Sequence, residues 1–163
     1  MDKQYFHFTI GPVQDFVAQA RRTRDFWAGS FLLSWLAGVA MTEVRHQGGT
    51  VEFPLPDENY LQWLTGDSDQ GQPPQQGAIP NRFKAYQAEV PRDFDPRRVE
   101  RVIRDAWRLL AERVWEADLD EVVRDGEQTR AIWDRQVNGF WELTWCLSES
   151  QQASDLLDRR KNW

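Results

Sequence analysis

The segment from Arg21 to Ser30 reads RRTRDFWAGS and holds three arginines within four residues. Guanidinium groups make paired hydrogen bonds with phosphates and with carboxylates. The arginine cluster therefore has two interpretations: it can attract a phosphate-bearing ligand, or it can be a solvated helix face with Asp25 as an ion-pair partner. The residue types alone leave both open.

The arginine cluster lies within a long segment, 10–40, whose apolar residues repeat at three- and four-residue spacings. This spacing predicts helix with an apolar stripe toward the core. Because a glycine followed by serine favours a bend, we predict one helix to about Asp25, a bend at Gly29-Ser30, and a second helix to about Arg45, ended by glycines. The predicted core stripe is Val13, Phe16, Val17, Ala20, Trp27, Phe31, Trp35 and Val39.

Composition limits the class of protein. The 163 residues are 40% hydrophobic and include nine tryptophans, which indicates a folded domain. A net charge of -6 argues against broad, non-specific binding to nucleic acid. The single cysteine, Cys146, rules out an internal disulfide and a cysteine-rich zinc site in this chain. No apolar run reaches the roughly 20 residues that span a bilayer, so we expect a cytoplasmic protein with no membrane partner.

The remaining elements follow from alternation, helical spacing and turn residues. Residues 5–10 alternate as a half-buried strand, with His7 opposite the phenylalanines and expected to be exposed or hydrogen-bonded. Asp95-Pro96 is a helix start, and Asn138-Gly139 is a turn signal. The other predicted elements are strand 50–53, a short helix at 60–64, a polar loop at about 66–77, strand 82–90, helices 95–117 and 121–136, and strand 140–147.

The predicted order is strand, helix, strand, strand, helix, strand. This is the order of the α+β ferredoxin-like (βαββαβ) fold, in which helices cover one face of an antiparallel sheet. We predict one such domain over 1–148, followed by a tail, 149–163.

Several short motifs are similar to those of one family. The chain contains GPVQDF, ARRTRDFWAGS and LLSWL in its first 36 residues, and later VEFP and IPNRF. In this order they resemble the first palm-like domain of the large, polymerase- and cyclase-related subunit of type III-B (Cmr) CRISPR effector complexes. The resemblance extends over essentially the whole chain and implies a role in antiviral defence.

The resemblance also implies an ATP pocket between two palm-like domains. In the family, a second palm holds Mg²⁺ with a Gly-Gly-Asp-Asp turn and makes cyclic oligoadenylate. This chain has no such turn, because its one Gly-Gly pair is followed by Thr50-Val51. We therefore expect a fragment of a larger subunit, without the nuclease domain, the zinc module that follows the tail, or the catalytic palm. Alone it should bind no cofactor and have no catalytic residue.

By the same resemblance, six residues are nucleotide-binding candidates. Ser30 would touch the nucleotide's sugar or phosphate, and Arg21 and Arg22 would steer phosphates, although ion pairing explains these arginines equally well. We expect Trp27 to be core, and Asn81 with Arg82 to brace the preceding loop. The six candidates are Gly11, Gln14, Arg21, Arg22, Gly29 and Ser30.

Two other functions remain open. The chain could be a structural module that docks other effector subunits, with tryptophans as interface anchors. It could also be a small RNA-binding domain, which predicts exposed aromatic side chains on the central strands; the first strand offers Tyr5 and His7 there. The expected partners are other Cmr subunits, with guide and target RNA contacted indirectly through the complex.

Overall fold

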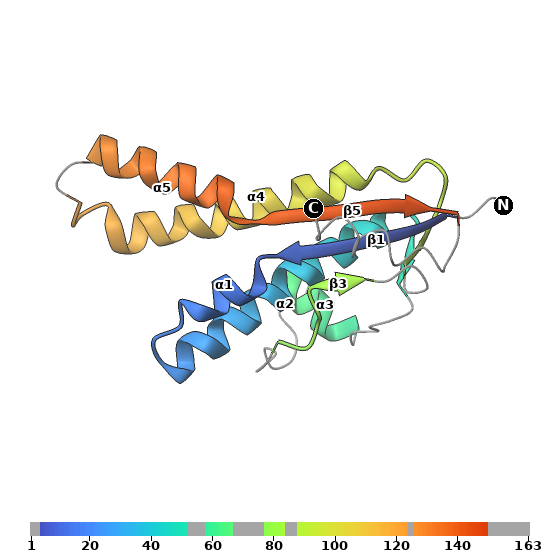
Figure 1. The fold of residues 1–163 in the computed structure, drawn as a ribbon, viewed down its shortest axis with the longest axis horizontal. Helices are drawn as coiled ribbons and strands as arrows, with labels where there is room; N and C mark the ends of the chain where they lie inside the picture. Colours follow the sequence, from blue (N-terminus) through green and yellow to red (C-terminus); the bar gives the residue numbers. More distant parts are fainter. Residues whose placement is uncertain (1–3, 52–57, 67–76, 84–87, 124–125, 150–163) are drawn as a thin grey trace.

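The fold is described from a computed structural model that covers residues 4–51, 58–66, 77–83, 88–123 and 126–149 (Figure 1). Strands and helices alternate along most of the chain. In order they are β1 Gln4–Gly11, α1 Val13–Ala18, α2 Thr23–His46, β2 Thr50–Val51, α3 Glu58–Thr65, β3 Arg82–Phe83, β4 Ala88–Val90, α4 Pro96–Val114, the π-helical segment η2 Trp115–Leu119, α5 Gly126–Phe140 and β5 Glu142–Ser148.

The strand pairing confirms the predicted fold class. β1 pairs with β5 from Tyr5 to Gly11, and its other edge pairs with β3 and β4. β2 pairs with β4, and every pair is antiparallel. The spatial order is therefore β2, then β4 and β3, then β1, then β5, as in a ferredoxin-like sheet.

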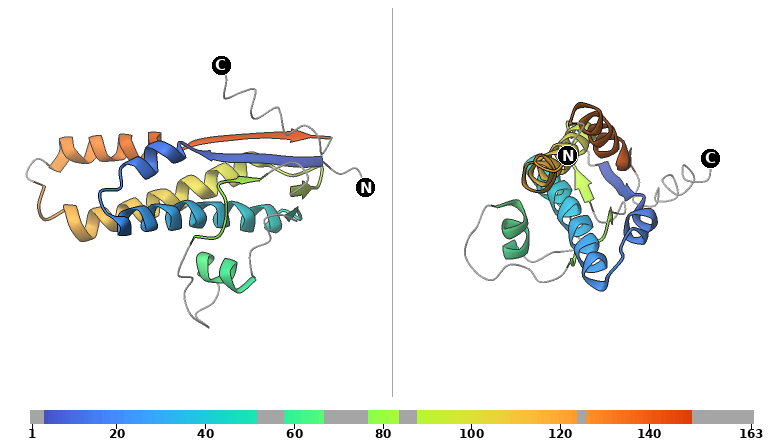
Figure 2. Two further views of the ribbon diagram at one scale, coloured as in Figure 1. Left: turned by 60° about the horizontal axis from the view of Figure 1, so that its bottom comes forward. Right: turned by 90° about the vertical axis from the view of Figure 1, so that its left-hand side faces the viewer.

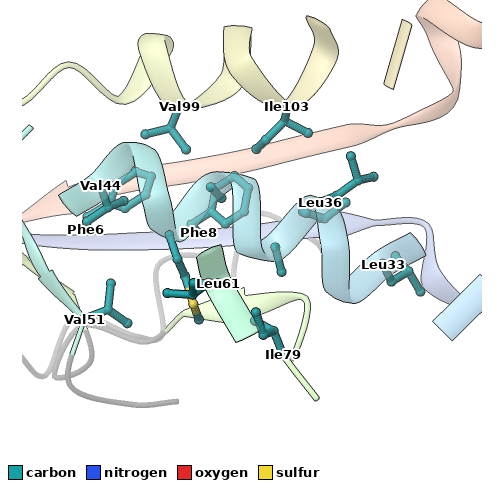
Figure 3. Close-up of a cluster of buried hydrophobic side chains, with 14 of the residues drawn as sticks. Phe6, Phe8, Leu33, Leu36, Val44, Val51, Leu61, Ile79, Val99 and Ile103 are labelled. Carbon is teal, nitrogen blue, oxygen red and sulfur yellow. The ribbon is translucent and has the colours of Figure 1, made fainter. Parts of the chain in front are cut away.

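The core lies between the sheet and helices α2 and α4, which occupy one side of the sheet (Figure 2). Alternate residues of β1 point toward these helices because successive strand side chains face opposite sides. Phe6, Phe8 and Ile10 are fully buried, and Val99 and Ile103 of α4 meet them from above the sheet (Figure 3).

The other face of β1 differs from the prediction. His7 and Thr9 were expected on a half-buried strand, yet they are 0% and 2% exposed. Both faces of β1 are therefore buried, since His7 and Thr9 alternate along the strand with Phe6, Phe8 and Ile10. The predicted exposed or hydrogen-bonded His7 is therefore wrong: its ring is buried, and within the described residues neither ring nitrogen has a hydrogen-bond partner.

The break in the first helical segment also lies elsewhere. The chain leaves helix after Ala18 and resumes at Thr23, whereas α2 continues without a bend through Gly29-Ser30. The Asp25 carboxylate accepts hydrogen bonds from the backbone N–H groups of Arg21 and Arg22, which fixes the new helix start. Gly29 lies within α2 next to Phe16 of α1, and a Cβ there would lie 3.4 Å from Cε1 of that ring, which is an ordinary contact distance.

The predicted core stripe is only partly correct. Val13, Phe16 and Val17 pack against the core. In α2, Phe31, Trp35 and Val39 are likewise partly buried and pack against the core, whereas Trp27 is 50% exposed. The buried apolar side chains of α2 form a different set: Leu33, Leu36, Ala37, Ala40, Met41 and Val44.

The second crossover is a helical hairpin formed by α4, η2 and α5, which projects beyond the end of the sheet (Figure 1). The predicted turn at Asn138-Gly139 is wrong, because both residues lie within α5. Asn138 bonds to helix neighbours instead: its amide donates to the carbonyl of Asp134 (2.7 Å), and its Oδ1 accepts from Nε of Arg108 (2.7 Å).

Several local predictions are confirmed. Asp95 caps α4 by accepting a hydrogen bond from the N–H of Arg97 (2.9 Å), with Pro96 in the first turn. Gly48 ends α2 with a positive φ of 79°. The predicted short helix is α3, while residues 84–87 of strand 82–90 and most of loop 66–77 and of tail 149–163 lie outside the described residues. Among the helices that are described, none is long and apolar enough to cross a membrane.

Candidate functional site

The first part of the candidate site is the end of β1, where Gly11 precedes α1. Asn81 clamps this end: its Nδ2 donates to the carbonyl of Ile10 (2.8 Å), and its carbonyl accepts from the N–H of Ile10 (2.9 Å). Gly11 itself pairs with Glu142 of β5, and its peptide bond to Pro12 is cis. Asn81 thus braces the end of β1, whereas the sequence predicted that it braces the preceding loop, most of which lies outside the described residues.

The second part is the basic start of α2. Arg21 and Arg22 are exposed, and their backbone N–H groups lie 3.2 and 3.0 Å from Oδ2 of Asp25. The other oxygen of Asp25 lies 3.7 Å from Nε of Arg24. The sequence allowed an ion pair between Asp25 and Arg21 or Arg22. In the structure, Arg24 makes this ion pair instead.

Gly29 and Ser30 lie about two turns further along α2. Gly29 is buried beneath Phe16 of α1, so it is unavailable to a ligand in this arrangement. Ser30 is partly buried, and its carbonyl lies against Gly77, where a Cβ would come within 2.6 Å. Gly77 must therefore be glycine for the chain to pass this close to α2.

A small hydrogen-bond network that sequence reasoning missed holds residues 77–81 against α2. The hydroxyl of Ser34 contacts the hydroxyl of Tyr60 (2.9 Å) and accepts from the N–H of Ile79 (2.8 Å). The Tyr60 hydroxyl also accepts from the N–H of Ala78 (3.2 Å). A serine within an apolar helix was the available signal, because a buried hydroxyl needs a partner.

The six candidates therefore fall into two groups. Gly11 is the last residue of β1, Gln14 lies in α1, and Arg21 and Arg22 lie just before α2 (Figure 1). Gly29 and Ser30 lie along α2, on sides that contact Phe16 and Gly77. A hollow of about 590 Å³ runs instead along β5, where its described lining residues are Leu143–Leu147. The hollow along β5 thus has none of the six candidates among its described lining residues.

The charge and burial of the sheet bear on the other functional hypotheses. Burial, with a smaller effect from the positive charge of Arg82, lowers the pKa of His7 below its usual value. A fully buried, neutral His7 offers no ring face to an RNA base, contrary to the prediction for an RNA-binding sheet. Within the described residues, no three His, Cys, Asp or Glu side chains are placed to hold a metal ion.

The strand order, with helices on one face of an antiparallel sheet, defines an α+β domain of the palm-like class. A search among curated proteins found no match. A family model described as CRISPR-associated protein Cmr2, N-terminal, matches residues 5–112. Because this match covers more than half of the chain, the chain belongs to that family. It is a domain of the large subunit of a type III-B CRISPR effector, a multi-subunit antiviral system.

Proposed function

We propose that this domain lines an ATP pocket shared with a second, catalytic palm-like domain that makes cyclic oligoadenylate. In this proposal the second palm holds the magnesium ions, and the present chain contributes the wall formed by the end of β1 and the start of α2. The family membership supports a role within the effector's large subunit.

The observation that carries the proposal is the placement of Arg21 and Arg22. Both are exposed and precede α2, a helix of 24 residues, whose amino end carries partial positive charge. Asp25 occupies their backbone N–H groups, so each contributes to a ligand through its side chain. Two guanidinium groups before α2, separated from the braced end of β1 by helix α1, suit the phosphates of a nucleotide. Gly11 and Gln14 flank the same end, and Ser30 supplies a hydroxyl further along α2.

ATP affinity of the subunit that carries this domain tests the proposal. Replacing Arg21 and Arg22 together by alanine should weaken ATP binding about tenfold or more, since each charge-assisted hydrogen bond contributes about 1.5–3 kcal/mol. The matched control is Arg97→Ala with Arg113→Ala, which removes two exposed arginines from α4. Isothermal titration with ATP and Mg²⁺ gives both affinities.

The outcome that overturns the proposal is an unchanged ATP affinity in the Arg21/Arg22 variant, or an equal loss in the α4 control. The latter would mean that overall charge, rather than this end of the sheet, attracts the nucleotide. Ser30→Ala provides a second measurement of ATP affinity, because it removes a hydroxyl group without changing the charge of the domain.

A further inference from the structure

The two sides of the sheet end in strands of different length. On one side β2 and β3 have two residues each, whereas on the other β5 has seven (Figure 1). Natural edge strands are usually short, or carry lysine, proline or a bulge, because an open edge can pair with another strand. From Leu143 to Ser148, β5 has no charged residue and no proline, and its register with β1 is continuous, without a bulge. The edge of β5 therefore lacks the features that normally prevent strand pairing.

The hydrogen bonds of β1 show which backbone groups of β5 face outward. The N–H and C=O groups of Ile10 both bond to Asn81, on the side of β3 (2.9 and 2.8 Å). Since successive strand residues direct these groups to opposite edges, those of Thr9 point toward β5, where Thr9 pairs with Thr144. Thr144 bonds back to β1 in the same way. The alternate residues of β5 therefore direct their N–H and C=O groups away from β1; they are Leu143, Trp145 and Leu147.

These outward groups lie beside a hollow. Within the described part of the chain, β5 pairs with β1 alone, and no hydrogen bond reaches the outward N–H or C=O groups of Leu143, Trp145 and Leu147. The hollow of about 590 Å³ is lined, among the described residues, by five consecutive residues, Leu143–Leu147. A hollow over one face of the sheet would contact alternate residues, because successive side chains lie on opposite faces. The hollow therefore runs beside the strand, along its unpaired backbone.

We propose that the edge of β5 binds an extended polypeptide segment of another effector subunit, which adds to the sheet as one more strand. N–H and C=O groups repeated at every second residue match the backbone of an extended chain, and strand addition is an established mode of peptide recognition. The hollow favours a single segment over the edge of a second folded sheet. The described lining residues carry no charge, whereas nucleic acid needs cations to neutralise its phosphates. Membership of a multi-subunit complex supplies other protein chains as the source of the segment.

The side chains of β5 determine which sequence the segment needs. Leu143, Trp145 and Leu147 pack against the core on the side of the sheet that the helices cover. The residues opposite them in the added strand should therefore be apolar, because directly opposed side chains contact each other. Thr144 and Cys146 lie on the other side, so the intervening residues should be small or polar. The segment is thus uncharged along the hollow, with an apolar residue at every second position. This interface goes beyond the proposed ATP pocket, since it includes none of the six nucleotide-binding candidates.

The test removes one outward N–H group and leaves the pairing with β1 intact. Leu147→Pro loses an N–H that points away from β1, a position at which an edge strand tolerates proline. Leu147→Ala is the matched control, because it shortens the side chain and keeps the N–H. Each variant of the subunit is titrated against the purified assembly of the remaining effector subunits and guide RNA. Leu147→Pro should weaken this binding at least tenfold and Leu147→Ala less than threefold, while the β1 amides keep their protection from exchange in both.

Peptides with methylated backbone nitrogens provide a second measurement, on the wild-type subunit. The probe is a fluorescently labelled peptide of alternating valine and threonine. Its valines belong on the side of the sheet that the helices cover, opposite Leu143, Trp145 and Leu147, so their N–H groups face β5. Methylation of the valine nitrogens should weaken binding at least tenfold, and methylation of the threonine nitrogens should change it less than twofold.

Three results would overturn the inference. The first is wild-type affinity of Leu147→Pro for the assembly, and the second is an equal loss in Leu147→Ala, which would assign the effect to the side chain. The third is a dimer of the isolated subunit that Leu147→Pro abolishes, which would assign the edge to a second copy. If Leu147→Pro fails to fold, the peptides decide, and equal binding of the two methylated forms contradicts strand addition. ATP affinity should stay at the wild-type value in both variants, so failure of this interface is distinguishable from failure of the ATP pocket.

Discussion

At the scale of single residues, the interior of the sheet contains an ionisable group in an apolar place. His7 is fully buried in the middle of the central strand, opposite Cys146 of β5, and Thr9 lies two residues away on the same face. Within the described residues, neither ring nitrogen of His7 has a hydrogen-bond partner, and the Thr9 hydroxyl has none either. Charging His7 there is costly, which is why burial lowers its pKa.

We predict that acid destabilises the domain through His7. An unfolded histidine binds its proton near pH 6.5, and the folded one binds it only at lower pH. As pH falls below about 6.5, the unfolded state therefore holds more protons, and the free energy of unfolding decreases by up to about 1.4 kcal/mol per pH unit. Urea unfolding between pH 7.5 and 5 measures this slope.

The control for His7 is His7→Gln, which cannot be charged. Its free energy of unfolding should change less than the wild type's between pH 6.5 and 5, even if it is lower at pH 7.5. Equal slopes in the two proteins would show that other groups cause the acid sensitivity.

At the scale of elements, the helical hairpin of α4, η2 and α5 is joined by one arginine. Arg130 of α5 donates to both carboxylate oxygens of Glu112, and its Nε donates to Asp134 (3.0 Å). Its guanidinium also lies 5.0 Å from the ring centroid of Trp115, which contacts Trp133. These hydrogen bonds lower the pKa of Glu112 and raise that of Arg130.

We predict that Arg130→Met loosens this hairpin without unfolding the sheet. The variant keeps the apolar stem but loses three hydrogen bonds and the contact with Trp115. Amide exchange in residues 108–138 should accelerate roughly several-fold, while the β1 amides keep their protection. Arg135→Met, at an exposed arginine of the same helix, is the control. Equal acceleration in both variants would contradict a specific role for Arg130.

At the scale of the whole molecule, an aromatic cluster connects α1 and the helical hairpin of α4, η2 and α5 to the sheet. Trp141, which is 4% exposed and precedes β5, lies 4.9 Å from Phe16 of α1 and 5.3 Å from Trp107 of α4, centroid to centroid. Phe140 of α5 lies 4.8 Å away. This cluster therefore couples α1, α4 and α5 at the end of the sheet where α2 begins.

We predict that Trp141→Ala destabilises the whole domain, by about 3–5 kcal/mol, because it leaves a cavity among three other rings. Trp27→Ala is the matched control: its ring is half exposed, so the loss should be within about 0.5–1 kcal/mol. Urea unfolding monitored by circular dichroism measures both. A large loss in Trp27→Ala would show that Trp27 is a core residue, as its spacing first suggested.

The sequence by itself determined the fold class, the family and where several helices begin and end. Alternation in β1, the Asp95 cap and the Gly48 helix end depend on short-range geometry, so they were readable in advance. The tertiary structure decided which apolar side of α2 meets the sheet, because both sides of an uncharged helix have suitable spacing. It also placed Gly29 inside α2 against Phe16 of α1. Asn138 likewise stays helical because Arg108, 30 residues away in the sequence, binds its side chain. Contacts between distant segments set these outcomes, and local spacing does not encode them.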